Sequence, residues 1–289
     1  MITDINATKL LVISDLHLGN PFSQAKRPTV EFLNWAAANG YDVAINGDGF
    51  EIAQVSFTRI AKDVPEVFHA LKTFTAQGRS LYYVIGNHDI VLENFLNDWG
   101  GFKMAPFLNV RSGDKRIRIE HGHLYDPAFV NNPALYEFLT WAAGIALQVH
   151  PGFYKLWMKF EKFKSRFLWG KKDIKSLAAA IEGAPLTRIP GEHPAFREAA
   201  LELSQRGFDS IVFGHTHHAG EVELETGAHY YNSGSWLIGT PFISIDQGRV
   251  TVEKWSRGWT PRSVTSAQTD ITVPQCDSNT SESSVTHVA

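Results

Sequence analysis

The sequence predicts an α/β protein with four layers, an α/β/β/α sandwich of two packed mixed sheets flanked by helices. Short apolar runs without polar alternation are typical of strands buried on both faces, and several such runs alternate with segments of helical periodicity. This alternation predicts a largely parallel sheet covered by helices. Short strand-like segments with Gly-rich turns follow at residues 221–254, and they predict a second, mostly antiparallel sheet packed on the first.

Four apolar runs are expected to form the parallel strands, and each ends at a short polar signature. They are residues 9–14, 41–46, 80–85 and 209–213. Helices are expected at residues 28–39 and 57–77, where apolar residues recur at helical spacing. Because open α/β sheets place their sites beyond the carboxyl ends of the strands, the polar signatures are expected in the loops of that edge.

Residues 131–190 interrupt this alternation of strands and helices and are expected to form a helical insertion. Asn132 and Pro133 suit the cap and the first position of a helix that runs to about Val149. A second helix is expected after it, with aromatic residues on one face and basic residues on the other. Residues 263–289 contain 11 Ser or Thr, which is typical of a disordered tail. The prediction is one domain, residues 1–262, followed by this tail.

Composition narrows the function classes. The net charge of −3 for 289 residues argues against a nucleic-acid partner. Residues 153–175 are the exception, with eight basic and two acidic side chains, so they carry +6 and the remainder −9. The single Cys276 excludes an intramolecular disulfide and a thiolate metal cluster. Without a visible signal peptide or a long apolar run, a cytoplasmic location is expected, with peripheral contact at the inner face of the membrane through residues 153–175.

Five short polar signatures recur in order along the chain. They are Asp15-Leu-His17, Gly47-Asp48, Gly86-Asn87-His88-Asp89, His121-Gly-His123 and Gly214-His215-Thr-His217. Their carboxylate, amide and imidazole groups suit divalent cations such as Mn²⁺, Fe²⁺ and Zn²⁺. Asp15 and His17 are two residues apart, so an extended strand end directs both at one ion, and the last signature repeats this spacing. The two oxygens of Asp48 suit a bridge between two ions about 3.5–4 Å apart.

In order, spacing and flanking residues, these signatures resemble those of the calcineurin-like metallophosphoesterases, over about residues 9–255. The resemblance implies a metallophosphoesterase domain with two divalent ions, Mn²⁺ ahead of Fe²⁺ or Zn²⁺. The first ion is assigned to Asp15, His17, Asp48 and His217. The second ion is assigned to Asp48, Asn87, His121 and His215.

The resemblance also implies the reaction, which is metal-dependent hydrolysis of a phosphoester or pyrophosphate bond. A hydroxide that bridges the two ions attacks phosphorus, and the ions neutralise the charge that develops. His88 is expected near the leaving oxygen as a general acid or hydrogen-bond donor, with Asp89 orienting it.

Several residues in or near the five signatures have either a role in the site or a purely structural one. His123 is a weaker ligand candidate than the first histidine of its signature. Asn46 and Glu51 flank the second signature and suit a supporting role as well as a plain turn. Residues 232–236 are expected to support the site through backbone contacts.

The insertion bears on the substrate. It is either a helical hairpin packed on the core or a lid, apolar inside for a lipid tail and basic outside for an anionic membrane. The lid arrangement is similar to that of the UDP-2,3-diacylglucosamine hydrolases, which makes a lipid-linked nucleotide the leading substrate. This chain differs from that branch at His88, where the branch commonly has arginine, and at Gly49, where it has a bulkier residue.

Two other functions stay open. One is a phosphodiesterase or phosphatase acting on soluble nucleotides or phosphoproteins. The other is a non-catalytic scaffold, which the complete ligand set disfavours. The expected partner is a phosphorylated small molecule or a lipid-linked substrate, and the sequence does not indicate an oligomeric state.

Overall fold

The computed structural model describes residues 3–95, 101–133, 135, 138–140, 142, 188–237 and 239–261. The chain divides into two compact units, residues 1–257 and 258–289, and the elements described below belong to the first. The predicted insertion lies mostly outside the described residues, and the predicted tail lies wholly outside them. The domain boundaries at 262 and 131–190 therefore stay predictions.

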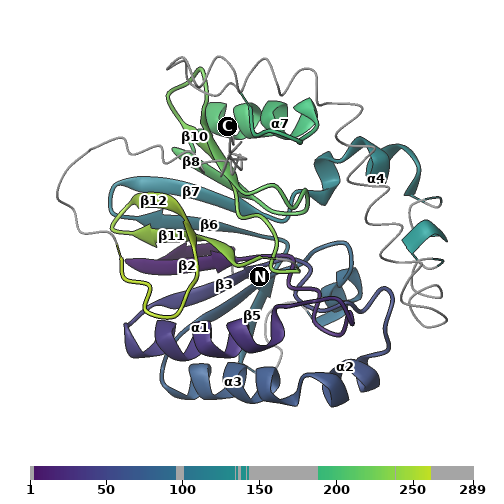
Figure 1. Cartoon of the computed structure of the whole chain (residues 1–289). Coiled ribbons are helices and arrows are strands. Elements are labelled where there is room, and N and C mark those ends of the chain that lie inside the picture. The colour runs from purple at the N-terminus through teal and green to yellow at the C-terminus, as the bar shows by residue number, and fades with distance from the viewer. Residues whose placement is uncertain are drawn as a thin grey trace, which may run out of the picture. The chain divides into compact units, whose positions relative to one another are not determined.

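Two mixed six-stranded sheets form the middle of the first unit (Figure 1). One has the order β12-β11-β2-β3-β4-β5 and is parallel from β2 to β5. Its strands are β2 (Lys9–Ile13), β3 (Asp42–Asn46), β4 (Leu81–Val84), β5 (Phe102–Ala105), β11 (Pro241–Asp246) and β12 (Arg249–Lys254). We call it the β2 sheet.

The other sheet has the order β1-β6-β7-β8-β10-β9, and we call it the β8 sheet. Its strands are β1 (Asp4–Asn6), β6 (Phe107–Ser112), β7 (Lys115–Glu120), β8 (Ser210–Phe213), β9 (Gly220–Glu223) and β10 (His229–Asn232). β8 lies parallel to both of its neighbours, β7 and β10, whereas β6 with β7 and β9 with β10 form antiparallel pairs.

Helices cover the outer faces of both sheets, which confirms the predicted four-layer α/β/β/α class. On the β2 sheet these are α1 (Lys26–Ala38) and α3 (Pro65–Ala76), preceded by α2 (Phe57–Asp63), and on the β8 sheet it is α7 (Pro194–Gln205). In α1, Thr29, Phe32, Leu33 and Ala36 are buried, the spacing of one helix face. Short segments η1 (Ile90–Phe95), η2 (His123–Tyr125) and α4 (Pro127–Asn131) complete the described elements.

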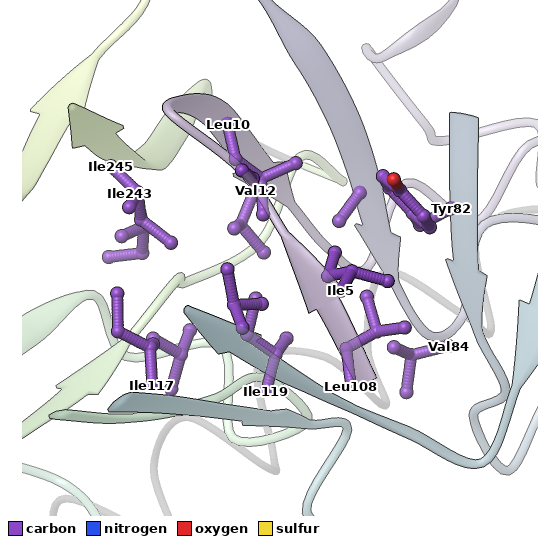
Figure 2. Packing of buried hydrophobic residues seen from close by; sticks show 14 of the residues in the cluster. Ile5, Leu10, Val12, Tyr82, Val84, Leu108, Ile117, Ile119, Ile243 and Ile245 are labelled. Atoms are coloured by element: carbon purple, nitrogen blue, oxygen red, sulfur yellow. The ribbon is translucent and has the colours of Figure 1, made fainter. Parts of the chain in front are cut away.

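The core lies between the two sheets. Figure 2 shows Leu10 and Val12 of β2 facing Ile117 and Ile119 of β7 across the interface, with Ile243 of β11 beside them. These five side chains are completely shielded from solvent. Burial of this kind stabilises by about 25 cal/mol per Å² of apolar surface, so the interface fixes the two sheets, and the loops at their edges, against each other.

Three details differ from the sequence prediction. The segment 221–254 does not form one sheet: β9 and β10 join β8, whereas β11 and β12 extend the β2 sheet. The run at 209–213, predicted beside the first three strands, belongs to the β8 sheet instead. The predicted helix 57–77 is also two helices, because Val64 precedes Pro65 and the residue before a proline is disfavoured in helical conformation.

Candidate metal centre

The loops after β2 and β3 run side by side and carry the first ligand candidates. Asp15 N donates to Gly47 O at 3.1 Å, and His17 N donates to Asp48 O at 2.9 Å. On the other flank, Trp236 N donates to Asp15 O at 3.1 Å, so the segment 232–236 supports the site through its backbone as predicted. The backbone that carries Asp15 is therefore held from two sides.

Left-handed backbone marks the ligand positions. Among the described residues, six non-glycine residues have positive φ, and five of them are ligand candidates. These five are Asp15 (52°), His17 (46°), Asp48 (52°), His215 (64°) and His217 (64°). Such conformations are costly for side-chain-bearing residues and concentrate at functional sites. This corrects the prediction for Asp15 and His17, because a turn with left-handed residues, and no extended strand end, directs both side chains.

The glycines of the signatures allow close approach around Asp48. A Cβ atom on Gly86 would lie 2.2 Å from Asp48 Oδ1, and one on Gly47 would lie 2.2 Å from Nδ1 of His121. Gly47 also has a positive φ of 78°. Any side chain at either position would displace a ligand candidate.

One cluster of donor atoms comes from Asp15, His17 and His217. His217 Nε2 lies 3.1 Å from Asp15 Oδ1 and 3.4 Å from His17 Nε2. All three ligand atoms lie within 4.8 Å of one another. The side chain of His217 is 37% exposed, whereas those of Asp15 and His17 are buried.

A second cluster comes from Asp48, Asn87, His121 and His215. Asn87 Oδ1 lies 3.2 Å from His121 Nε2 and 3.0 Å from His215 Nδ1. Asp48 Oδ2 lies 3.4 Å from His121 Nε2 and 3.9 Å from His17 Nε2, so it sits between the clusters. The structure thus brings all seven predicted ligands together in two adjoining groups. Their assignment to particular ions stays a prediction.

These residues fit divalent cations. His121 donates Nδ1–H to the carbonyl oxygen of Asn46 at 2.8 Å, which leaves its Nε2 directed at the oxygens of Asn87 and Asp48. A lone pair facing two acceptor oxygens is repulsive unless a cation or a proton lies between them. Asp15 Oδ1 is likewise buried without a hydrogen-bond donor of suitable geometry among the described residues, although His217 Nε2 is close. Oxygen and imidazole donors in this number suit Mn²⁺, Fe²⁺ or Zn²⁺.

Glu51 connects the first cluster to His88. Its Oε2 accepts a hydrogen bond from His17 Nδ1 at 2.9 Å, and its Oε1 accepts one from His88 Nδ1. The side chain of Glu51 is only 1% exposed. Of the two interpretations that the sequence left open, the structure supports a role in supporting the ligands.

Asp89 has other partners, which corrects the prediction that it orients His88. Its carboxylate accepts from the backbone N–H groups of Gly49 at 3.0 Å and Gly86 at 2.7 Å, and from the hydroxyl of Tyr83. It therefore ties the second signature to the third. Burial and the nearby Asp48 raise the pKa of Asp89 to about 6.

The electrostatics of the metal-free site favour the protonated forms of His88 and His121. Burial alone would lower the pKa of His88, but the carboxylates of Glu51 and Asp48 outweigh it and raise that pKa to about 10. In the same way, Asp48 and Asp15 overcome burial and raise the pKa of His121 to about 9. Burial raises the pKa of Asp48 too, yet the surrounding imidazoles hold it well below its usual range. A cation bound by His121 would displace the proton of that ring.

The sequence prediction missed two supporting residues. Asp126, the residue before α4, accepts a hydrogen bond from His215 Nε2 at 2.9 Å. Glu192, which is 4% exposed, accepts from Thr216 Oγ1 at 2.6 Å and from Asn232 Nδ2 at 2.8 Å, and so holds the last ligand loop. Neither residue belongs to a signature. A lone carboxylate near a predicted helix start was the one available signal for Asp126, and nothing in the pattern indicated Glu192.

His123 stays outside the ligand set. Its ring lies 5.5 Å from the ring of His121 and 5.1 Å from that of Phe129, centre to centre, and its Nδ1 is buried without a hydrogen-bond partner among the described residues. Burial and the neighbouring histidines lower the pKa of His123 to about 3, so it is neutral at physiological pH.

Comparison with protein families matches residues 8–219 to the calcineurin-like phosphoesterases. The chain belongs to this family. The calcineurin-like assignment rests on most of the domain, from the strand before Asp15 to the residues after His217. It supports metal-dependent phosphoester hydrolysis as the chemistry of the site. A comparison with curated proteins gave no match.

Solved structures with a similar fold include three with identities of 13–14%. A dimetal phosphatase from Danio rerio has 13% identity and a TM-score of 0.46, over 86% of this chain and 96% of that one. Vps29 from Entamoeba histolytica in complex with Zn²⁺ has 14% identity and a TM-score of 0.36, over 86% and 98%. A predicted phosphoesterase from Streptococcus pneumoniae has 13% identity and a TM-score of 0.36, over 88% of this chain and 91% of that one. Identities this low say nothing about the reaction or partners of this chain.

Proposed function

We propose that this chain hydrolyses phosphoester or pyrophosphate bonds with two divalent ions, and that its substrate is a lipid-linked nucleotide of the UDP-2,3-diacylglucosamine kind. The observation that carries the hydrolytic part is the convergence of seven oxygen and nitrogen ligands, with Asp48 between the two clusters. When bound, the ions would acidify water and neutralise the charge on the phosphoryl oxygens.

His88 supplies a proton donor at the edge of this site. One of its ring nitrogens belongs to a group with ligand atoms of His17 and Asp48, all within 4.8 Å of one another. Its Nδ1 is bound to Glu51, and its pKa of about 10 keeps the ring protonated at neutral pH in the metal-free protein. A protonated imidazole placed here can donate to the oxygen that leaves phosphorus.

Exposed apolar side chains support the lipid part of the proposal. Those described with large exposed faces are Phe57, Ile90, Val91, Leu124, Val130, Leu135, Phe138 and Leu139. Ile90 and Val91 directly follow the third signature, and Leu124, which is 62% exposed, follows the fourth. Exposed apolar residues directly after the loops of a site suit contact with an acyl chain.

His88 also favours a second candidate, a phosphoester with an alkoxide leaving group. An alkoxide needs a proton as it departs, whereas a phosphate released from a pyrophosphate has a pKa near 6 and leaves without one. The UDP-2,3-diacylglucosamine hydrolases commonly have arginine at this position, and arginine stabilises charge but does not transfer a proton. His88 therefore suits the cleavage of ordinary phosphodiesters or monoesters.

One experiment separates the two candidates. Metal-free protein is reconstituted with Mn²⁺ and assayed on UDP-2,3-diacylglucosamine in detergent and on bis-p-nitrophenyl phosphate. The lipid proposal expects strong preference for the lipid nucleotide and a higher KM for it, but not for the diester, in Leu124→Ser and Ile90→Ser. Turnover of the diester alone would discard the lipid substrate, and no turnover of either by a metal-loaded protein would contradict both candidates.

Location and membrane contact stay predictions from the sequence. Among the described residues, no helix combines the length and the apolar character needed to cross a bilayer. The basic segment 153–175 lies outside those residues.

A further inference from the structure

A single carboxylate joins the second ligand cluster to helix α4. Asp126 Oδ2 lies 2.9 Å from His215 Nε2, while its Oδ1 accepts a hydrogen bond from Ala128 N at 2.8 Å. Asp126 is the N-cap of α4, and the backbone amides of Phe129 and Val130 also donate to its carbonyl oxygen. The side chain is 24% exposed, so it is partly shielded from water.

The contact with His215 decides which ring nitrogen carries the proton. A carboxylate can only accept, so His215 Nε2 must be the donor. In the neutral ring Nδ1 then carries a lone pair, and this atom faces the second cluster, 3.0 Å from Asn87 Oδ1. A metal ion is bound by that lone pair, and the alternative tautomer would present a proton to it.

We propose that Asp126 is a positioning residue for the metal centre: it fixes the tautomer and the ring orientation of His215 so that Nδ1 can bind the second ion. This inference rests on the proposed two-metal function. His17 and His121 have equivalent supports in Glu51 and the carbonyl of Asn46, which act through Nδ1 and leave Nε2 free. Asp126 accepts from Nε2 of His215. A neutral imidazole that binds a metal ion through Nδ1 must carry its proton on Nε2, so this contact suits such a ligand.

The competing role is a helix cap alone, and two substitutions distinguish the roles. Asp126→Ser keeps a capping oxygen for Ala128 N and removes the group that reaches His215. Asp126→Asn keeps the size and the cap, but when its oxygen faces Ala128 N its amide N–H₂ faces His215 Nε2. An amide donor there favours the wrong tautomer.

The first readout is Mn²⁺ binding to the metal-free full chain, by equilibrium dialysis with elemental analysis. We expect both variants to bind the second Mn²⁺ about 10–100-fold more weakly than the wild type, with the first Mn²⁺ unchanged. In a His215→Ala background the Asp126→Asn change should have no further effect. Asp42→Asn is the matched control, because its Oδ1 accepts a backbone hydrogen bond from Ser80 N at 2.8 Å outside the metal centre.

The second readout needs no metal. Nitrogen-15 spectra of the histidine-labelled chain, with His215→Ala for assignment, report which nitrogen is protonated. We expect Nε2–H in the wild type and a shifted tautomer ratio in Asp126→Asn. Wild-type Mn²⁺ affinity in both variants, or an unchanged tautomer, would overturn the inference. If the wild type binds a single Mn²⁺ and Asp126→Asn still shifts the tautomer ratio, the two-metal function is contradicted, but Asp126 keeps its role in fixing the tautomer of His215.

Discussion

Two almost completely buried glutamates support opposite halves of the metal centre, and their pKa values are shifted in opposite directions. Glu51 holds the loops that follow β2 and β4, through the imidazoles of the ligand candidate His17 and of His88. Glu192 supports the loop after β8, and its partners are the hydroxyls of Thr216 and Tyr230 and the amide of Asn232.

The partners explain the difference. Burial would raise the pKa of Glu51, but two adjacent imidazoles that can become cations hold it far below its usual range. Burial raises the pKa of Glu192 to about 7, because neutral donors only partly offset the loss of water. One glutamate is therefore a permanent anion that sets the charge of the site, and the other is a structural acceptor. We expect the β2 half to control the reaction and the β8 half to control the shape of the last ligand loop.

The largest effect is expected for His88→Ala, which tests whether the chemistry lies in the β2 half. Loss of a general acid should lower turnover by about 10²–10⁴-fold while both metal ions stay bound. The loss should be greater for an alkyl phosphodiester than for bis-p-nitrophenyl phosphate, whose leaving group needs little protonation. Turnover and metal content of the same preparations are the measurements.

His229→Ala is the control for this prediction, because His229 lies on β10 and pairs with Glu221 at the surface. Its activity should equal that of the wild type. Metal content that falls together with the rate in His88→Ala would make His88 a ligand and contradict its assignment as a proton donor.

A smaller effect, with a distinctive pH signature, is expected for Glu51→Gln. Removal of the charge takes away the largest influence that raises the pKa of His88, so this ring should lose its proton at a lower pH. The basic limb of the kcat profile on an alkyl phosphodiester should then move to lower pH. Metal affinity should also fall about 10–100-fold, because His17 loses its support, so the profile is measured at saturating Mn²⁺. An unchanged basic limb would show that Glu51 does not control the protonation of His88.

How far the sequence predicts this molecule depends on the distance between partners along the chain. The seven ligands are predictable because each lies in a short signature, and six of them, all except His121, follow an apolar run. Glu51 is within reach of the same reasoning, since it lies three residues after Asp48. The left-handed turns at Asp15 and His17 could not be predicted, because backbone contacts with the loop after β3 and with Trp236 impose them.

The β8 half illustrates what sequence reasoning loses. Glu192 contacts Asn232, 40 residues further along the chain, and Asp126 contacts His215, 89 residues further along. No repeating pattern in the sequence links residues at either separation. The same holds for the sheets, where β11 pairs with β2 from the other end of the domain and β12 pairs with β11. Apolar runs predict strands and their class, but the choice of partner sheet depends on packing between distant segments.

The smallest effect is expected for Glu192→Gln, and its pH dependence has a definite sign. The amide can keep the acceptor oxygen that Thr216 and Asn232 share, so activity should stay within about threefold of the wild type. The folded-state pKa of Glu192 is raised from 4.5 to about 7, so the native protein binds more protons than the unfolded chain and the wild type loses stability as pH rises from about 4.5 to 7. Glutamine has no such loss. The free energy of unfolding of the variant, relative to that of the wild type, should therefore be about 1 kcal/mol higher at pH 8 than at pH 6, since one pKa unit corresponds to ~1.4 kcal/mol. Thermal melts of both proteins at the two pH values measure this difference. A gain at the lower pH instead would mean that Glu192 is charged in the native protein, and the contrast with Glu51 would disappear.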